Sequence, residues 1–202
     1  MRGLYAITPE GFAEADTLAR SSEIVAAGAS LLQYRDKSND ASKRLRQAGQ
    51  LKQLCSDNSC LFIVNDDIEL AAAVAADGVH LGRDDARMEL ARRRLGPEAI
   101  IGVSCYNQLE RARQAEAEGA TYLAFGAFFP SQVKPGAPVA GQNLLDRRQS
   151  GLTRPQCAIG GITAERAPEL IGAGADMLAV ISALYDAPDS GRAAAEFIRC
   201  FC

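Results

Sequence analysis

Three basic residues, Arg35, Lys37 and Lys134, follow short apolar runs and could bind phosphate oxygens. Arginine can do so through two parallel hydrogen bonds, and lysine acts as a point charge. Asp66 and Asp85 come after two neighbouring apolar runs, and two carboxylates can share one Mg²⁺ that also binds water and substrate phosphates. The residue types and their order therefore indicate chemistry on a phosphorylated small molecule.

A second phosphate site of a different kind is indicated near the C-terminus by Gly160-Gly161 and Ile181-Ser182. Each pair follows an apolar run, at a place where backbone N–H groups can hold a phosphate. One site built from cations and metal, together with one built from backbone amides, suggests two phosphorylated substrates.

Short apolar runs alternate along the chain with amphipathic, alanine-rich stretches, and this alternation predicts strands and helices in turn. The expected strands are Leu4–Thr8, Leu31–Arg35, Leu61–Asn65, Gly78–Gly82, Ile100–Cys105, Tyr122–Phe128, Gln156–Gly160 and Met177–Ser182. The clearest expected helices are Ala13–Ala27, Ala41–Cys55, Asp85–Leu95 and Asn107–Glu118. The strands are nearly continuous apolar runs, which is typical of strands covered by helices on both sides.

Local signals mark several junctions between the expected elements. Gly28, Gly78, Gly119 and Gly174 each stand between a helical stretch and a strand, where glycine can close a helix in the left-handed conformation. Asn107, with a glutamate three residues later, matches the capping box that begins a helix.

Eight strands alternating with helices, without a dinucleotide-binding fingerprint, predict one compact (β/α)₈ barrel domain over residues 1–202. An open, doubly wound parallel sheet is the alternative. In a barrel, the candidate residues above would gather on the loops that follow the C-terminal ends of the strands, where such barrels carry their active sites.

The composition is compatible with this interpretation. The 202 residues are 48% apolar, enough for one core, and 22 basic against 25 acidic residues give no reason to expect nucleic acid or an acidic membrane as partner. No signal peptide or membrane span is visible, so we expect a cytoplasmic protein. Six cysteines without a C-x-x-C pair and one histidine, His80, favour free thiols over a zinc site.

The motifs in this order resemble the thiamine phosphate synthase family along nearly the whole chain. The matching segments are 33–37 (QYRDK), 62–66 (FIVND), 77–82 (DGVHLG) with Asp85, 102–104 (GVS), 129–131 (FPS), Lys134, 159–163 (IGGIT) and 180–182 (VIS). The resemblance implies the (β/α)₈ fold and transfer of a pyrimidinylmethyl group from its pyrophosphate to the nitrogen of a thiazole phosphate, with Mg²⁺ as cofactor. It also implies a dissociative substitution in which pyrophosphate leaves first, so that no protein nucleophile is needed.

The resemblance also implies residue roles. The pyrimidine pyrophosphate would be held by Gln33, Arg35, Lys37, Asn65, Ser104 and Lys134, of which Arg35, Lys37, Ser104 and Lys134 would be catalytic. Asp66 and Asp85 would bind Mg²⁺, and Ser131, Gly161, Ile181 and Ser182 would hold the thiazole phosphate. Val133 is also expected among the substrate-binding residues; it stands where many family members have threonine, so it would offer that phosphate a backbone amide but no side-chain hydroxyl.

Two other functions remain open from the sequence. A related thiazole tautomerase uses a histidine shortly after the Gly-Val-Ser segment, where this chain continues Cys105-Tyr106-Asn107, and His80 is interpreted as a structural residue within a strand. A non-catalytic barrel that binds thiamine precursors would not need the Asp66 and Asp85 pair. The expected partners are small molecules, and the oligomeric state is open, a homodimer being one option.

Overall fold

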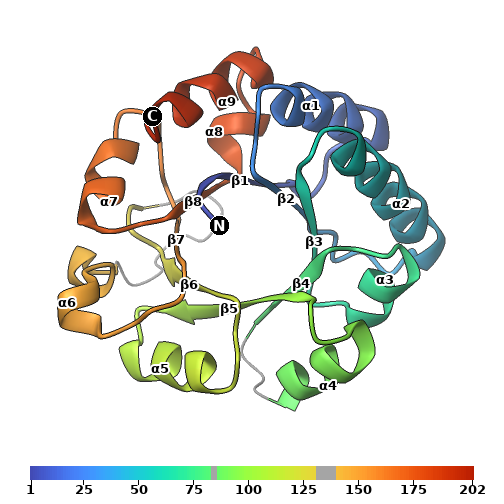
Figure 1. Cartoon of the computed structure of the whole chain (residues 1–202). Coiled ribbons are helices and arrows are strands. Elements are labelled where there is room, and N and C mark those ends of the chain that lie inside the picture. Colours follow the sequence, from blue (N-terminus) through green and yellow to red (C-terminus); the bar gives the residue numbers. More distant parts are fainter. Residues whose placement is uncertain (83–85, 131–139) are drawn as a thin grey trace.

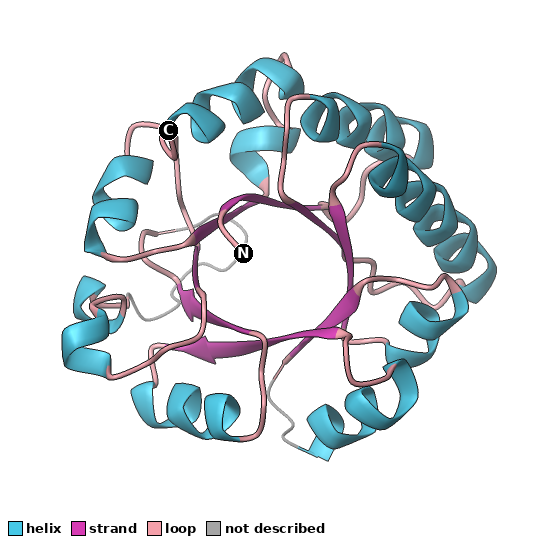
Figure 2. Cartoon of the chain, viewed as in Figure 1, coloured by secondary structure: helices cyan, strands magenta, loops and turns pink. Residues whose placement is uncertain are grey.

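The computed structural model describes residues 1–82, 86–130 and 140–202 of the chain. Eight parallel strands form a closed barrel in sequence order, surrounded by helices (Figures 1 and 2). The strands are β1 (Gly3–Ile7), β2 (Leu31–Tyr34), β3 (Leu61–Asn65), β4 (Gly78–Leu81), β5 (Ile100–Tyr106), β6 (Tyr122–Gly126), β7 (Gln156–Ile159) and β8 (Met177–Val180). Because β1 pairs with β8 as well as with β2, the closed barrel is confirmed and the open sheet is excluded.

Helices follow the strands and form the outer ring. They are α1 (Glu14–Ala26), α2 (Ala41–Asp57), α3 (Ile68–Ala73), α4 (Ala86–Leu95), α5 (Leu109–Ala117), α6 (Arg147–Ser150), α7 (Ala167–Ala173), α8 (Ser182–Tyr185) and α9 (Ser190–Arg199), with a 3₁₀ turn at Gln142–Leu144. The four helices expected from the sequence agree with α1, α2, α4 and α5 to within two residues at each end.

Each strand is buried on both faces, because alternate side chains point into the barrel and out toward the helices. In β1, Leu4 and Ala6 join the core between barrel and helices, whereas Tyr5 and Ile7 belong to the core inside the barrel. The interior core also contains Leu31, Ile63, Tyr122, Ala124, Cys157, Met177 and Ala179. The barrel is therefore filled with side chains rather than hollow along its length.

Glycine has a steric purpose at two places in the barrel wall. A Cβ at Gly102 would lie 2.0 Å from Cζ of Tyr122, so this glycine makes room for the tyrosine ring inside the barrel. Gly78 does not close a helix as expected, since it opens β4 and a Cβ there would lie 1.9 Å from the carbonyl oxygen of Ile100. The expected helix-closing role holds at the other three junctions, where φ is +106° at Gly28, +95° at Gly119 and +120° at Gly174.

The expected capping box at Asn107 is wrong. Helix α5 begins at Leu109, its N-cap is Gln108, and no side chain caps it. Glu110 instead pairs with Arg113 one turn later along the helix. The pattern fits a capping box by spacing, but the last residues of β5 extend to Tyr106 and delay the start of the helix.

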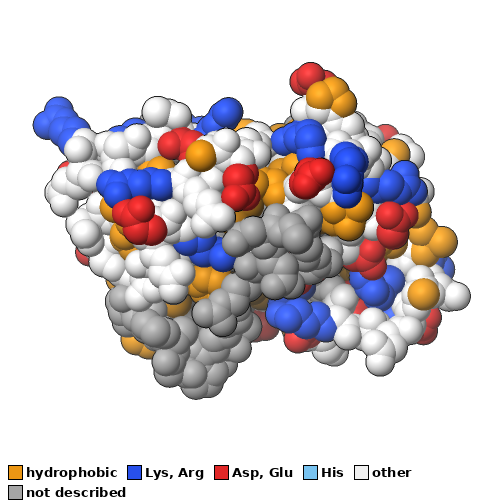
Figure 3. Space-filling view, turned by 90° about the horizontal axis from the view of Figure 1, so that it is seen from below, with side chains coloured by type: hydrophobic (Ala, Val, Ile, Leu, Met, Phe, Trp, Pro, Cys, Tyr) orange, Lys and Arg blue, Asp and Glu red, His pale blue; other side chains and the backbone are white. Residues whose placement is uncertain are grey.

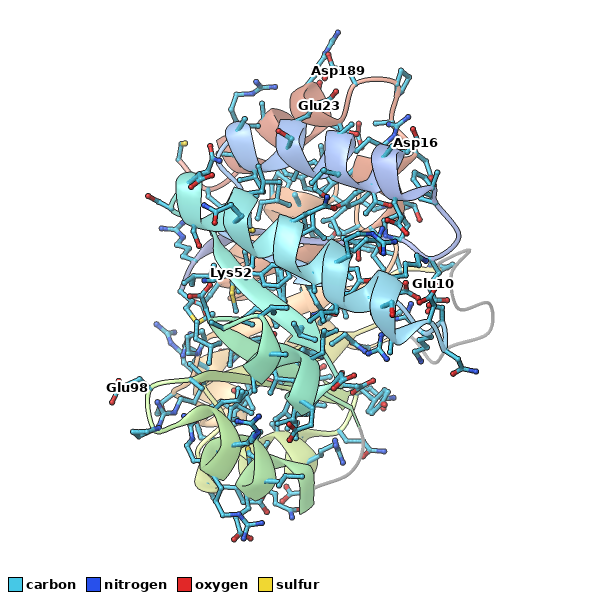
Figure 4. All side chains as sticks on the ribbon, turned by 90° about the vertical axis from the view of Figure 1, so that its right-hand side faces the viewer. Glu10, Asp16, Glu23, Lys52, Glu98 and Asp189 are labelled. Carbon is cyan, nitrogen blue, oxygen red and sulfur yellow. The ribbon has the colours of Figure 1, made fainter. Side chains whose placement is uncertain are left out.

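The two ends of the barrel are distinguishable in Figure 4, where Glu10, which follows β1, and Glu98, which precedes β5, lie at opposite ends.

Basic and acidic side chains are mixed over the coloured part of the face in Figure 3. Within the part of the chain that the structure describes, no helix has the length and apolar character needed to cross a membrane.

Candidate active site

A cavity of about 890 Å³ opens at the end of the barrel where the strands terminate. Every strand, or the residue directly after it, contributes to its wall. The lining includes Ile7, Gln33, Arg35, Asn65, His80, Ser104, Gly126, Ile159, Gly160, Gly161, Ile181 and Ser182. A cavity of this size can hold small organic molecules, and its position is the one at which barrel enzymes carry their chemistry.

Arg35 brings a positive charge to this cavity from the end of β2. Its backbone N–H donates to Oγ1 of Thr8 at 2.8 Å, which ties the ends of β1 and β2 together. Its guanidinium lies 2.8 Å from a carboxylate oxygen of Glu10, and the Arg35 side chain is 19% exposed. The charge is therefore held at the cavity by backbone and ion-pair contacts rather than left on a mobile surface side chain.

The loop after Arg35 is fixed by Asp36. The Asp36 carboxylate accepts the Ser38 backbone N–H at 2.7 Å and pairs with Lys43 at 2.9 Å. Burial alone would raise the pKa of Asp36, but the hydrogen bonds from Ser38 and Lys43 outweigh it and lower the pKa to about 2. Lys37 is exposed in this loop and is not among the residues that line the cavity.

Three successive residues at the end of β3 have separate tasks. Asn65 lines the cavity, and its amide donates to Oδ2 of Asp66 at 2.8 Å. Asp66 has a φ of +59° and accepts the Gly82 backbone N–H through Oδ1 at 3.0 Å. Asp67 caps α3 by accepting from Leu70 N–H. The two adjacent carboxylates thus have different positions: Asp66 lies beside the end of β4, and Asp67 caps α3.

Arg111 connects the ends of β4 and β5. Its Nε donates to the Ser104 carbonyl at 2.7 Å and its Nη2 donates to the Gly82 carbonyl at 2.8 Å. Its guanidinium also lies over the ring of Tyr106, which itself lines the cavity. Arg111 therefore fixes the backbone of Ser104 and of Gly82, whose N–H group donates to Asp66, and nothing in the sequence alone singled it out.

A continuous series of hydrogen-bonded side chains crosses the barrel at the floor of the cavity. Gln33 Nε2 donates to the Tyr5 hydroxyl at 2.6 Å, and this hydroxyl lies 2.7 Å from that of Tyr122. The Tyr122 hydroxyl lies 2.9 Å from His80 Nδ1, and His80 Nε2 lies 2.9 Å from Ser104 Oγ. Burial raises the pKa of both tyrosines well above the ordinary value, so both hydroxyls keep their protons.

Tyr5, His80 and Tyr122 are functional candidates that the sequence did not reveal as a group. His80 does lie within a strand, as expected, but it also lines the cavity and touches Ser104. The available signal was the inward position of each residue in its strand, and this signal is shared by every apolar residue of the interior core.

The loop after β7 offers backbone amides to the cavity. Gly160 and Gly161 have φ values of +101° and +64°, and a Cβ at Gly161 would lie 2.5 Å from the Pro130 carbonyl oxygen. The backbone N–H groups of Gly161 and Ser182 make no hydrogen bond to the described residues. The Gly161 amide stands in a lining segment whose backbone only glycine can adopt without strain, and the Ser182 amide lies after β8, at the start of α8.

Arg166 adds a cation at the rim of this loop. Its Nη1 donates to the Gly161 carbonyl at 3.1 Å, and its guanidinium lies 4.6 Å from the centre of the Phe129 ring. It lines the cavity, although the sequence motifs did not include it.

The structure brings together most of the candidate residues that it describes. The residues that line the cavity are Gln33, Arg35, Asn65, Ser104, Gly161, Ile181 and Ser182. Lys37 and Asp66 are described but are not part of its lining. The candidates Asp85, Ser131, Val133 and Lys134 lie outside the described residues.

Comparisons with known proteins agree with the motifs. The family model described as thiamine monophosphate synthase matches residues 4–184. The chain is 53% identical to the thiamine-phosphate synthase of Chromobacterium violaceum over 96% of this chain and 93% of that protein. It is 52% identical to that of Azoarcus sp. over 94% and 92%, respectively. Among solved structures, it is similar to the thiamine phosphate pyrophosphorylase of Pyrococcus furiosus, with a TM-score of 0.86, 34% identity and coverage of 98% of this chain and 95% of that one.

Proposed function

The chain belongs to the thiamine monophosphate synthase family of transferases, and on that premise we propose how its cavity joins two phosphorylated substrates. The pyrimidine pyrophosphate binds beside β2 to β5, and the thiazole phosphate binds beside β7 and β8. The products are thiamine phosphate and pyrophosphate.

One observation supports this proposal: two walls of one cavity carry unlike groups, each suited to binding an anion. One wall presents the Arg35 guanidinium and the Asn65 amide, and the other presents the amides of the Gly161 and Ser182 segments. Strands β3 and β7 are four places apart in the ring of eight and therefore lie on opposite sides of the barrel (Figure 1). Two small molecules bound to these walls would meet above the interior core.

The reaction requires positioning rather than a protein nucleophile. The bond between the pyrimidinylmethyl carbon and the pyrophosphate oxygen breaks, and its electron pair leaves with pyrophosphate. The lone pair of the thiazole nitrogen then forms the new carbon–nitrogen bond. Arg35 stabilises the charge that develops on the leaving group, while the Gly161 segment holds the thiazole phosphate so that its nitrogen faces the carbon.

The described part of the metal site fits Mg²⁺. Mg²⁺ prefers oxygen ligands, commonly one or two carboxylates completed by water and substrate phosphates. Asp66 places a carboxylate near the end of β4, oriented by Gly82 and Asn65, and Asp85 comes three residues after Gly82 in the sequence. Asp66 and Asp85 would hold the ion, which when bound would neutralise part of the pyrophosphate charge.

The test of this function is a direct assay. Purified protein is mixed with the pyrimidine pyrophosphate, the thiazole phosphate and Mg²⁺, and thiamine phosphate and pyrophosphate are measured, with EDTA as the control. We expect both products in equal amounts and loss of the reaction in EDTA. A folded protein that binds either substrate without forming product would favour the non-catalytic alternative instead.

The tautomerase alternative receives no support from the described site. That reaction needs a histidine shortly after the Gly-Val-Ser segment of β5, and here the cavity wall at this position carries Tyr106. Incubation with the thiazole tautomer alone provides the matching assay, and we expect no isomerisation.

A further inference from the structure

The hydrogen bonds that link Gln33 to Ser104 all run one way: each group donates to the next group toward Ser104. The Gln33 amide nitrogen can only donate, so the Tyr5 oxygen accepts from it. The Tyr5 proton must then go to Tyr122, the only other hydrogen-bond partner of this hydroxyl among the described residues. The Tyr122 proton goes in turn to His80 Nδ1.

This sequence of donors determines the tautomer of His80. When Nδ1 accepts, the neutral imidazole carries its proton on Nε2, which donates to Ser104 Oγ. The Ser104 hydroxyl proton is then available to the cavity. At the other end of this hydrogen-bonded series, the side-chain amide oxygen of Gln33 has no hydrogen bond to a described residue, and Gln33 lines the cavity.

The reverse direction would leave a buried proton without an acceptor. If Ser104 donated to Nε2 and Nδ1 donated to Tyr122, the Tyr122 proton would go to Tyr5. The Tyr5 oxygen would then accept from both Tyr122 and Gln33, and its own proton would have no acceptor among the described residues. A fully buried hydroxyl without a partner is costly, which favours the first direction.

We propose that Tyr5, Tyr122 and His80 are positioning residues that present the side-chain amide oxygen of Gln33 as an acceptor and the Ser104 hydroxyl as a donor. This pair selects a heteroaromatic ring whose edge carries an amino donor and a ring-nitrogen acceptor. The inference rests on the proposed function, because it assigns the wall at β2 and β5 to the aminopyrimidine. It explains why five different strands each direct one of these five polar side chains into the barrel.

Ring packing holds these hydrogen-bonded side chains in place. The His80 and Tyr122 rings stack with centroids 5.6 Å apart, and the Tyr5 and Tyr122 rings meet edge to face at 5.8 Å. Gly102 leaves the space that the Tyr122 ring occupies. Because both tyrosines are at most 1% exposed, water has little access to compete for these hydrogen bonds.

The direction of these hydrogen bonds can be measured without an activity assay, because His80 is the only histidine in the sequence and its tautomer reports the direction. The wild-type protein, labelled with ¹⁵N in the imidazole ring, is examined by long-range ¹H–¹⁵N correlation at pH 8 in the absence of substrates. We expect one neutral ring with the proton on Nε2. A proton on Nδ1 would overturn the proposal, whether or not the enzyme makes thiamine phosphate.

A kinetic experiment tests the effect on specificity. The substrates are the aminopyrimidine pyrophosphate and its analogue with an oxo group in place of the amino group, which reverses the donor and acceptor edge. Tyr122→Phe should reduce the wild-type preference in kcat/KM about tenfold, the effect of about one buried hydrogen bond. The KM for the thiazole phosphate should stay unchanged.

Tyr185→Phe is the matched control, because Tyr185 is also fully buried and its hydroxyl makes one hydrogen bond, to Ser21 at 2.8 Å, outside the cavity. This variant should keep the wild-type preference. Unaltered discrimination in folded Tyr122→Phe, or an equal loss in both tyrosine variants, would overturn the positioning role. Failure of the wild-type enzyme to make any product would instead contradict the proposed function and leave the tautomer measurement intact.

Discussion

In the proposed site, Arg35 would meet two requirements of a contact to the leaving pyrophosphate. Its backbone is tied to Thr8, and its guanidinium is oriented by Glu10 at the wall of the cavity. Glu10 is half exposed at the rim, so an arriving pyrophosphate can take its place as the partner of the charge. A cation prepared in this way costs little reorganisation when charge develops on the leaving oxygen.

Replacing Arg35 with alanine should lower kcat/KM by about 10²–10³ or more, because one preorganised contact to a developing anion typically contributes that much. Steady-state rates measure the loss, and a thermal melt verifies the fold. Arg192→Ala serves as control, since Arg192 is a 79% exposed residue on α9. A folded Arg35→Ala enzyme with near-normal rates would remove Arg35 from the site.

Asp66 and Asp67 allow a second test with neighbouring residues. Asp66→Asn removes the charge proposed to bind Mg²⁺, and we expect the Mg²⁺ concentration for half-maximal activity to rise at least about tenfold. Asp67→Asn keeps a good N-cap for α3 and weakens only the ion pair with Arg44, so it should change stability by less than about 1 kcal/mol.

The measurement for this pair is a Mg²⁺ titration of activity at saturating substrates, followed by urea unfolding of both variants. An equal rise in the Mg²⁺ requirement of both variants would indicate a general charge effect rather than a metal ligand at Asp66.

At the scale of the element, the loop after β7 needs glycine at position 161 to adopt its backbone conformation. Gly161 has a φ of +64°, and Phe129 and Pro130 leave no space for a Cβ. Such a loop can turn its amides toward an anion only if the residue has no side chain. The neighbouring helix α7 contains Gly172, where a Cβ would meet nothing within 4 Å.

Gly161→Ala should raise the KM for the thiazole phosphate about tenfold or more, because strain of about 1–3 kcal/mol displaces the loop amides. The KM for the pyrimidine pyrophosphate should change little. Gly172→Ala should instead stabilise the protein by about 0.5–1 kcal/mol and leave both KM values unchanged. Initial rates over both substrate concentrations and urea unfolding distinguish these outcomes.

At the scale of the whole molecule, the six cysteines differ in how far their thiols are buried in the core. All six are free thiols, of which Cys55, Cys60, Cys105 and Cys157 are buried, Cys200 is partly exposed and Cys202 is exposed. Burial raises the pKa of Cys105 to about 12, although nearby Arg111 opposes the shift. Burial also raises the pKa of Cys157 inside the barrel.

A thiol reagent at pH 8 should therefore label Cys202 rapidly and Cys200 more slowly in the native protein, and the other four only after unfolding. Thiolate is the reactive form, so at Cys105 and Cys157 the raised pKa and the burial both slow labelling. Peptide mass spectrometry identifies the labelled sites, and Cys202→Ser should abolish the fast phase. Rapid native labelling of Cys157, which is fully buried beside the cavity, would mean that a reagent reaches the barrel interior through the cavity or by opening of the strands.

Several features follow from local sequence alone. Continuous apolar runs determine the eight strands, since burial on both faces removes the polar alternation of an exposed sheet. Glycine at Gly28, Gly119 and Gly174 determines where helices end, because a left-handed residue is a local requirement. The alternation of strand and helix is likewise enough to place Gln33, Asn65 and Ser104 at strand ends.

Contacts between residues far apart in the chain depend on the tertiary structure instead. Barrel closure required the pairing of β1 with β8, and the same apolar runs would also suit an open sheet. The Tyr5 and Tyr122 hydroxyls that meet inside the barrel are 117 residues apart. Strand periodicity predicts which side chains point inward, but it cannot say which of them meet, because register and closure set those distances. Local sequence thus selects the residues that reach the site, and closure of the barrel selects their hydrogen-bond partners.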